Sequence, residues 1–492
     1  MLRSYILIVD NSKSLYRALI SRDRRFDGLF FVGVTSTGIY CRPICPVKPP
    51  KQSNCRFFKT APAAEQAGFR PCLRCRPELA PGHAPIDQSQ RIAHLIVQRI
   101  ENSRDDEESN LEKIAREFDL SSRQIRRIVQ KEIGVPPIQL LLTRRLLLAK
   151  QLLTETQLPI IDIAFASGFS SLRRFNDAFS RRYRMPPSRL RKSSGSTNQS
   201  LIHEDVSSIQ LAYRPPYDWS GILAFLRARQ MKGVEHATES TYLRTVHIGN
   251  HKGWIKVSQS TKAHTLTLEF PNVLSPILPP LISRVRNLFD LDARPEIISR
   301  HLAKDPTLKP IIKSNRGLRV PGAFNGFELA LRAILGQQIT VKAATTLACR
   351  IAAAFGEPIA TPFAELNRLS PSPARLAKAA VSDLARLGII SARAKTIIAL
   401  AQAQISDSLS LDSGAHHDPE TFIQRLTELP GVGTWTAHYV AMRALRWPDA
   451  FPSGDIAVRK NLGNITAKQA EALSQTWRPW RSYAVLHIWH RH

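Results

Sequence analysis

Five of the six cysteines of this 492-residue chain lie near its start, and four of them have the spacing of a metal site. Cys41-x3-Cys45 and Cys72-x2-Cys75 are two close pairs separated by a longer loop. A tetrahedral four-thiolate zinc site needs two such pairs, and in a reducing compartment the cluster indicates metal or thiol chemistry instead of disulfides. Cys55 is a fifth thiol that could replace one ligand, although its strand-like surroundings predict a packed core residue. Scattered structural cysteines are the alternative.

A second candidate for chemistry lies near the end of the chain, where Asp455 follows a glycine-rich turn. The run from Leu429 to Ala437 is typical of a helix-hairpin-helix, in which Gly431 and Gly433 let consecutive backbone N–H groups point outward at a helix N-terminus. Such a turn binds DNA phosphates without reading sequence, often with a bound monovalent cation. Asp455 comes 22 residues after Gly433 at the start of an expected helix, so an ordinary capping role is the alternative to catalysis.

The charge balance predicts a polyanionic partner. Lys and Arg total 69 against 40 Asp and Glu, a formal net charge of +29, and each phosphate that such a chain neutralises releases counterions. A merely basic soluble protein is the alternative.

No segment approaches the roughly 20 apolar residues needed to span a bilayer. The opening apolar run, Tyr5 to Val9, is too short for a signal peptide. We therefore expect a cytoplasmic protein.

Between the two candidate sites, a helix-turn-helix pattern occurs twice. Residues 111–128 predict a helix, a turn and a second helix capped by Ser121, and residues 160–175 repeat the pattern with Gly168 in the turn and Ser170 as the cap. This doubled pattern resembles the AraC-type DNA-binding domain, whose two recognition helices enter adjacent major-groove segments. The outward candidates for base or phosphate contact are Arg123, Gln124, Arg127, Arg173 and Arg174. A solvated helical bundle with basic faces is the alternative.

Composition predicts a multidomain chain with four folded parts. These are a small zinc-bound α+β domain (15–85), an all-α double helix-turn-helix domain (88–192), a second α+β domain (207–290) and an all-α helix-hairpin-helix domain (291–492). A polar linker is expected over 193–206. In the second α+β domain, we expect a helix over Trp219–Arg229 and strands over Thr241–Ile248, Gly253–Val257 and His264–Phe270.

The cysteine segment resembles the N-terminal domain of the Ada adaptive-response regulators, through residues 26–45 and 67–75. The resemblance implies that the four cysteines hold zinc and that Cys41 accepts a methyl group from a methylphosphotriester in the DNA backbone. Zinc would keep the sulfur deprotonated and nucleophilic, and methylation would remove one negative charge, which could switch DNA affinity. Thr37, Arg42 and Arg70 flank the thiols and are candidate phosphate contacts. A purely structural zinc ion is the alternative.

From residue 207 onward the chain resembles AlkA-type DNA-3-methyladenine glycosylases, through residues 211–219, 327–340 and 477–489 and the hairpin with its aspartate. The resemblance implies that a flipped nucleotide enters a pocket where the Asp455 carboxylate stabilises positive charge on the sugar and can orient water. Trp435, Tyr439 and Trp489 would line the pocket and stack on a cationic base. Core packing is the alternative role for these aromatic residues.

Two positions depart from patterns seen among relatives. Trp435 stands where lyase-type relatives carry a nucleophilic lysine, which implies a monofunctional enzyme that leaves an abasic site. Gln338 stands where an apolar wedge fills the gap left by the flipped base, so efficiency or base preference can differ. The chain also lacks the Pro-Cys-His-Arg site of alkylguanine methyltransferases and a late four-cysteine iron–sulfur cluster.

These features together predict a DNA repair glycosylase for alkylated bases that is also a methylphosphotriester acceptor and a sequence-specific transcriptional regulator. The expected cofactors are one zinc ion and a monovalent cation at the hairpin. The expected partners are double-stranded DNA, including promoter sites, and RNA polymerase. The alternative is a transcriptional regulator with structural zinc and a glycosylase-like domain that only binds DNA.

Overall fold

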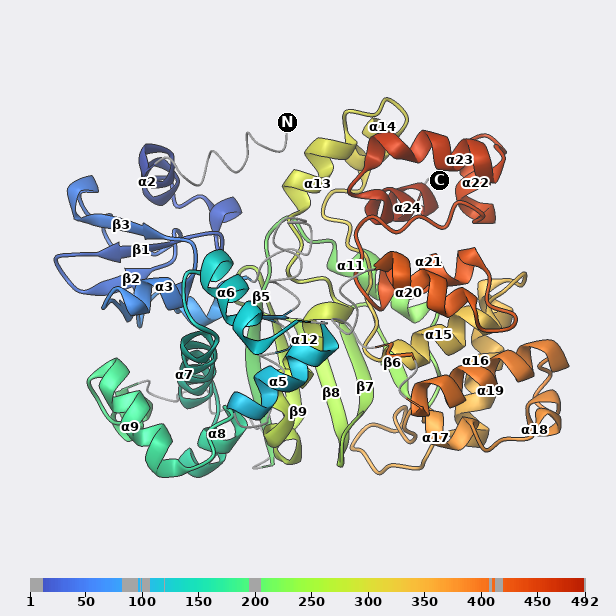
Figure 1. Ribbon diagram of the computed structural model, residues 1–492, viewed down its shortest axis with the longest axis horizontal. Helices are drawn as coiled ribbons and strands as arrows, with labels where there is room; N and C mark the ends of the chain where they lie inside the picture. Colours follow the sequence, from blue (N-terminus) through green and yellow to red (C-terminus); the bar gives the residue numbers. More distant parts are fainter. Residues whose placement is uncertain are drawn as a thin grey trace. The chain divides into compact units, whose positions relative to one another are not determined.

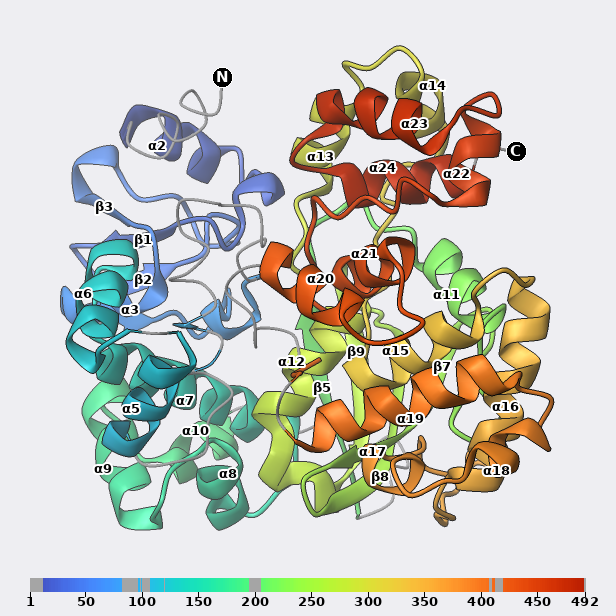
Figure 2. The ribbon, with the colours of Figure 1, turned by 45° about the vertical axis from the view of Figure 1, so that its right-hand side comes forward.

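The chain folds into two compact units (Figure 1, Figure 2). The structure, a computed structural model, describes residues 12–81, 96–97, 99, 107–118, 120–193, 205–406, 409–411 and 419–490. The first unit comprises Met1–Pro215 and Ser260–Leu281, and the second comprises Pro216–Gln259 and Ile282–His492. Most of the expected linker and the run from Tyr5 to Val9 lie outside the described residues. Across the described part of the chain, no helix has the length and apolarity to cross a membrane.

The first unit begins with a four-stranded sheet in the order β3-β1-β2-β4. The strands are β1 (Phe31–Val34), β2 (Ile39–Cys41), β3 (Cys55–Phe58) and β4 (Arg70–Pro71). Strand β1 is antiparallel to β2 and β3, whereas β2 is parallel to β4. Strand β2 therefore ends at Cys41 beside β4, which leads directly into Cys72, so the sheet brings the two cysteine pairs together. The helical segments around this sheet are α2 (Ser12–Ile20), η1 (Arg24–Phe26), η2 (Gln52–Asn54), α3 (Ala61–Gln66) and η3 (Pro77–Leu79).

The doubled helix-turn-helix follows in the same unit, and its long central helix α7 joins the two repeats (Figure 1). The helices are α5 (Glu107–Glu117), α6 (Ser122–Ile133), α7 (Pro137–Glu155), α8 (Ile160–Ala166), α9 (Leu172–Tyr183) and α10 (Pro187–Ser193). Ser121 caps α6 in a capping box with Gln124, as predicted. The prediction that Ser170 caps α9 is wrong. Because α9 begins at Leu172, the hydroxyl that reaches the Arg174 amide, at 3.2 Å, belongs to Ser171.

The second α+β segment contributes strands to both units. In the first unit, β5 (Val206–Ala212) pairs antiparallel with β9 (Thr265–Pro271), which leads into η5 (Asn272–Ile277). In the second unit, β6 (Glu235–Ala237), β7 (Thr241–Ile248) and β8 (His251–Gln259) form an antiparallel meander next to α11 (Trp219–Arg227). These elements confirm the expected helix and strands to within a few residues.

Among the described residues, the remaining named elements are helical. They are α12 (Leu278–Leu288), α13 (Pro295–Leu302), α14 (Leu308–Ser314), α15 (Gly326–Leu335), α16 (Val341–Phe355), α17 (Pro373–Leu376), α18 (Val381–Ala385), α19 (Ser391–Ile405), α20 (Pro419–Thr427), α21 (Thr434–Arg443), α22 (Ile456–Asn461), α23 (Ala467–Ser474), η6 (Gln475–Trp477) and α24 (Arg481–Trp489). The nearly buried α15 packs against α16, α19 and α21, and α22 packs against α24. This packing brings the N-termini of α21 and α22 and the end of α24 to one cavity.

Candidate zinc centre and candidate active site

The four predicted cysteines form one cluster. The sulfur atoms of Cys41, Cys45, Cys72 and Cys75 all lie within 4.8 Å of one another. Cys55 stands apart, and its thiol donates a hydrogen bond to the Lys51 carbonyl at 3.4 Å. Four sulfurs at this separation match the donor set of a tetrahedral zinc site. The other three ligands are buried, whereas Cys41 is partly exposed, so Cys41 is the most accessible of the four residues.

Backbone amides support the zinc ligands. The Arg42 amide donates to Cys75 Sγ at 3.3 Å, and the Arg74 amide donates to Cys72 Sγ at 3.4 Å. Hydrogen bonding with Cys45 and Cys72 raises the pKa of the Cys41 thiol, whereas hydrogen bonding from Cys41 lowers the pKa of Cys72. The sulfurs thus compete for the ionised form, and a divalent cation removes that competition because it stabilises every thiolate.

The predicted phosphate contacts around the zinc centre differ in their exposure. Thr37 is exposed and Arg70 is half-buried, so both remain candidates. Arg42 is only 7% exposed, and its guanidinium binds the Asp27 carboxylate and donates to the Cys75 carbonyl at 3.1 Å. This placement argues against a phosphate contact by Arg42. Sequence reasoning missed the exposed Arg74, although its position between two ligands in the Cys72–Cys75 turn could have indicated it.

The recognition helices α6 and α9 present equivalent faces. Ile125 and Val129 of α6 are buried, as are Phe175 and Phe179 of α9. The exposed positions in the first half of each helix are Arg123, Gln124, Arg126 and Arg127 of α6 and Arg173, Arg174, Asn176 and Asp177 of α9. The predicted reading residues are therefore accessible, and Arg126 and Asn176 belong to the same faces. The equivalent positions Arg127 and Asp177 have opposite charge.

The predicted catalytic and base-binding residues line one cavity of about 1340 Å³ in the second unit. Asp455, Trp435, Tyr439, Trp489 and Gln338 all contribute to its wall. They come from α21, α22, α24 and the turn after α15, which are distant in sequence. The cavity is large enough to hold a nucleotide base.

The Asp455 carboxylate is held by three N–H donors. It caps α22, with Oδ1 accepting from the Val458 amide at 2.9 Å, and the same oxygen accepts from Trp489 Nε1 at 3.1 Å. Oδ2 accepts from Trp435 Nε1 at 2.9 Å. Asp455 is 8% exposed, and no Lys or Arg within the described ranges pairs with it. The capping role is thus real, and the carboxylate also presents an uncompensated negative charge to the cavity.

The aromatic wall serves two purposes. Trp435 and Tyr439 stack with ring centroids 5.3 Å apart, and the Trp489 ring lies 6.3 Å from Tyr439. The indole N–H groups of both tryptophans hold the carboxylate, so these residues position Asp455 in addition to offering ring faces to a base. Sequence reasoning gave them only the second role.

Sequence reasoning also missed two arginines in this wall. The Tyr439 hydroxyl accepts a hydrogen bond from Arg443 Nη1 at 2.6 Å, and the Arg229 guanidinium lies 3.7 Å from the Phe225 ring centroid. Burial alone would raise the pKa of Tyr439, but Arg443 and Arg229 lower it below its ordinary value. The side of the cavity wall at Tyr439 therefore carries two cationic guanidinium groups.

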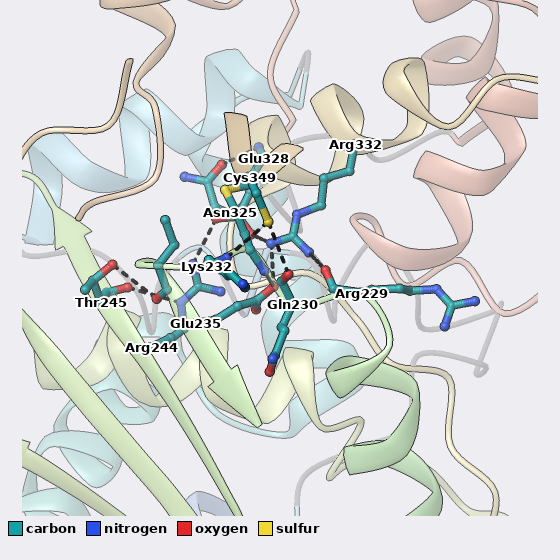
Figure 3. A network of polar contacts seen from close by, with 12 residues as sticks. Arg229, Gln230, Lys232, Glu235, Arg244, Thr245, Asn325, Glu328, Arg332 and Cys349 are labelled. Atoms are coloured by element: carbon teal, nitrogen blue, oxygen red, sulfur yellow. Dashed lines mark hydrogen bonds and ion pairs between the residues drawn. The ribbon is translucent and has the colours of Figure 1, made fainter. Parts of the chain in front are cut away.

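A buried ion network supports the cationic side (Figure 3). Glu328 pairs with Arg244 at 2.9 Å and with Arg332 at 3.0 Å, and Arg332 also pairs with Glu235. Burial would raise the pKa of Glu328, but the two arginines lower it to about 2. Arg332 Nη1 donates to the Arg229 carbonyl at 2.8 Å, while Figure 3 shows the Arg229 side chain pointing away from the network. The network thus fixes the backbone from which Arg229 projects.

A hydrogen-bonded glutamine joins the helix-hairpin-helix to the turn at residues 336–338, which carries Gln338 and which we call the wedge turn. Gly431 has a φ of 83°, and a Cβ there would lie 2.2 Å from Thr396 Oγ1, so glycine is required. Gly433 caps α21 and faces open space, as a phosphate site needs. Gln337 Nε2 donates to the Gly431 carbonyl at 2.9 Å, and the next residue, Gln338, is exposed with a φ of 56°. Gln337 thereby ties the wedge turn to the hairpin, and no pattern in the sequence indicated this contact.

Four family models match consecutive parts of the chain. Residues 14–78 match the metal binding domain of Ada, and residues 114–193 match a helix-turn-helix domain. Residues 208–325 match the AlkA N-terminal domain, and residues 331–481 match the HhH-GPD superfamily of base excision DNA repair proteins. The match to the Ada domain and the sulfur geometry together establish a zinc site on the four cysteines.

Relatives match both the whole chain and its second half. The probable bifunctional transcriptional activator/DNA repair enzyme AlkA of Mycobacterium tuberculosis is 36% identical over 98% of this chain and 96% of its own length. DNA-3-methyladenine glycosylase 2 of Escherichia coli is 35% identical over 57% of this chain and 96% of its own length. The solved 3-methyladenine DNA glycosylase of Archaeoglobus fulgidus, at 18% identity and a TM-score of 0.51, shares the fold of 57% of this chain. Because the first of these matches spans nearly all of both proteins, the chain belongs to the family of bifunctional AlkA transcriptional activators and DNA repair enzymes.

Proposed function

We propose that the second unit hydrolyses the N-glycosidic bond of alkylated bases of the 3-methyladenine type in DNA. The observation that carries this proposal is the Asp455 carboxylate, uncompensated and held by three N–H donors at the wall of a base-sized aromatic cavity. As the bond to an extruded base breaks, positive charge develops on the sugar and the carboxylate stabilises it. The base leaves with the bonding electron pair, and water adds to the anomeric carbon and loses a proton to the solvent.

The leaving group needs little help from the protein. Alkylation of a purine at N3 or N7 makes the base cationic, and its departure as a neutral molecule requires no general acid. The stacked rings of Trp435 and Tyr439 offer faces on which such a base can lie. In the proposed reaction, the main tasks of the protein are therefore to extrude the nucleotide, to position it and to stabilise the positive charge on the sugar.

We further propose that excision leaves an abasic site without strand cleavage. Strand cleavage in the lyase class requires an amine that forms a Schiff base with the sugar. Trp435 has no amine, and its indole N–H is occupied by Asp455. The lysine along the cavity wall is Lys460. Borohydride added during the reaction should therefore trap no protein–DNA adduct, and an adduct that disappears in Lys460→Gln would contradict the proposal.

For the zinc centre, we propose that Cys41 accepts the methyl group of a methylphosphotriester. The Cys41 sulfur attacks the methyl carbon, a C–S bond forms, the C–O bond breaks, and the phosphodiester leaves as an anion. Zinc, when bound, keeps the ligand sulfurs deprotonated. The support for Cys41 is its exposure, since it is the least buried of the four ligands. The neighbouring Thr37, Arg70 and Arg74 are available to hold the DNA backbone.

For the helix-turn-helix domain, we propose sequence-specific promoter binding that activates transcription together with RNA polymerase. The exposed faces of α6 and α9 carry side chains suited to base edges and phosphates. Loss of one negative charge at the zinc centre would reduce its repulsion from DNA phosphates and raise promoter affinity. Promoter affinity measured before and after methylation tests this link, and an unchanged affinity would contradict it.

The experiment that tests the glycosylase is the release of free base from duplex DNA containing 3-methyladenine. Wild type should release the base, and Asp455→Asn should lower the rate by about 10² to 10³-fold because the charge is lost while the shape is kept. Asp218→Asn is the matched control, since Asp218 caps α11 outside the cavity. If wild type released no base, or if the two variants had equal rates, the second unit would only bind DNA and Asp455 would only cap its helix.

A further inference from the structure

Strand β5 is held from its free side by a helix of the DNA-binding domain. It lies at the edge of its sheet, with β9 as its partner on one side. On the other side, the last turn of α7 binds both the backbone amide and the backbone carbonyl of Gln210. The Gln210 amide donates to Glu155 Oε2 at 3.0 Å, and Gln151 Nε2 donates to the Gln210 carbonyl at 2.9 Å. Edge strands expose such unpaired backbone groups, so this contact satisfies groups that would otherwise need water.

Glu155 also contacts the segment from Cys72 to Glu78, which we call the zinc segment. Its other carboxylate oxygen, Glu155 Oε1, pairs with Arg76 Nη2 at 2.7 Å. Arg76 follows the zinc ligand Cys75 directly and has a left-handed backbone with a φ of 55°. The Glu155 side chain is 7% exposed, so this carboxylate is a buried bridge with one oxygen on β5 and the other on the zinc segment.

A second contact joins the end of β5 to the other cysteine pair. Arg214, which is 2% exposed, donates to the Asp27 carbonyl and to the Pro81 carbonyl, each at 3.1 Å. The Asp27 carboxylate in turn binds Arg42, the residue after Cys41. The packing is close, because a Cβ at Gly28 would lie 2.0 Å from the Pro81 carbonyl oxygen. Arg214 therefore depends on the loop that positions Arg42.

A third contact fixes α7 against the zinc ligands themselves. Lys150 is 1% exposed, and its Nζ donates to the carbonyl of the ligand Cys72 at 3.1 Å. The same ammonium group pairs with Glu78 at 2.7 Å. A buried cation that loses its partners is strongly destabilising, so the position of α7 depends on the order of the segment from Cys72 to Glu78.

We propose that the zinc segment and the last turn of α7 form an intrachain docking surface for residues 206–214, so that zinc binding stabilises the first strand of the glycosylase. The match to the AlkA N-terminal domain begins inside this segment, at residue 208. Without zinc, the segment from Cys72 to Glu78 loses its main constraint, and Arg76 and Glu78 no longer hold Glu155 and Lys150 in place. Strand β5 then loses its outer partner. This linkage requires zinc binding but neither methyl transfer nor base excision.

Hydrogen exchange of the full-length protein tests the proposal directly. In the zinc-loaded protein, amides in residues 206–212 should be protected. Removal of zinc with a chelator should accelerate their exchange by about tenfold or more, and Glu155→Ala should do the same with zinc present. Glu112→Ala is the matched control, since Glu112 is exposed in the same domain. If chelation opens residues 39–45 and 70–79 but leaves 206–212 unchanged, the proposal is wrong.

The reciprocal measurement is the zinc affinity of the protein when a residue next to β5 is substituted. Because linkage is symmetric, a variant in which residues 206–214 dock less well, such as Arg214→Ala, should also bind zinc less tightly. We expect several-fold weaker zinc retention in competition with a chelator, with exposed Arg17→Ala equal to wild type. Should Arg214→Ala not fold, Arg214→Lys keeps a donor and should show a smaller loss in the same direction. Equal zinc affinity in wild type and a folded Arg214 variant would overturn the linkage.

Discussion

The zinc centre and the Asp455 cavity use hydrogen-bond donors in opposite ways. At the zinc centre, backbone amides donate to the sulfurs of the supporting ligands Cys72 and Cys75, and hydrogen bonds with the Cys45, Cys72 and Cys75 thiols reach the Cys41 sulfur. At the cavity, three donors converge on the reactive carboxylate itself. A sulfur that must attack needs its electron density, whereas a carboxylate that stabilises a neighbouring charge needs to remain ionised and fixed.

The two regions also differ in what happens after reaction. In the proposed methyl transfer, Cys41 keeps its new C–S bond, so each protein molecule would react once and the methylated sulfur would record the event. The proposed Asp455 reaction leaves the carboxylate unchanged, and its hydrogen bonds hold it for the next substrate. In the proposed chemistry, one reaction therefore consumes the sulfur of Cys41, whereas the carboxylate of Asp455 is reused.

The largest expected effects come from substituting Cys41 and Asp455, each in a separate variant. Cys41→Ser should abolish methyl uptake from methylphosphotriester DNA, because the hydroxyl is a far weaker nucleophile than a thiolate. Asp455→Asn should take up the methyl group at the wild-type rate while losing base release. Intact mass and free-base assays measure the two activities, and Cys55→Ser is the control because Cys55 lies outside the cluster. Methyl uptake by Cys41→Ser would transfer the acceptor role to another sulfur.

The next largest expected effect is that of acid on α24, the helix whose Trp489 supports the Asp455 carboxylate. Burial, followed by the charge of His490, lowers the pKa of His487 on α24 to about 4 from an ordinary 6.5. The unfolded chain therefore binds a proton first, and stability present above pH 6.5 is lost as pH falls toward 4. The loss is at most about 3 kcal/mol. His487→Gln should flatten unfolding free energy against pH over this window, and exposed His247→Gln should not. Parallel curves for both variants would exclude His487 as the cause.

Removal of single donors from the carboxylate should have a smaller effect. Trp435→Phe or Trp489→Phe keeps a ring but deletes an N–H, and a hydrogen bond to a charged group contributes about 1.5–3 kcal/mol, or about 10- to 100-fold in rate. The loss should fall on kcat more than on KM. Trp477→Phe is the matched control, because its N–H donates to Asp305 at 2.7 Å, away from the cavity. A kcat loss as large for Trp477→Phe would indicate general destabilisation.

The smallest expected effect concerns the wedge turn. Gln338→Leu removes an exposed amide that can hydrogen-bond the base left behind by the flipped nucleotide. Base release from duplex DNA should change by less than about tenfold, and its dependence on the opposite base should weaken. Single-stranded substrate is the control, since it has no opposite base. A large change on single strands would place Gln338 at the damaged base instead.

Sequence patterns predicted the parts of the molecule that depend on local spacing. The cysteine pairs, the Ser121 cap and the glycines of the hairpin each follow from residues a few positions apart. The resemblance to known families supplied Asp455 and the aromatic residues. Ser170 was misplaced as a cap because two adjacent serines precede α9 and only the exact start of the helix selects Ser171.

Contacts between distant segments could not be predicted. Arg42 was a candidate phosphate contact because it flanks a zinc ligand, but its guanidinium binds the carboxylate of Asp27, 15 residues earlier in the chain. The indole donors to Asp455 come from residues 20 and 34 positions away, on separate helices. Arg443, Arg229 and Gln337 have no motif of their own. Their roles appear only when tertiary packing brings them to the cavity.

The opposite charges of Arg127 and Asp177 have a consequence for the promoter. The two recognition helices have the same burial pattern, yet Asp177 pairs with Arg181 at 2.9 Å while Arg127 is exposed on its own helix. If both helices bind DNA as proposed, one polypeptide would present two chemically different faces to the duplex. A matching operator would have no dyad symmetry, and the protein would sit on it in a single direction, which gives the bound complex an upstream and a downstream end.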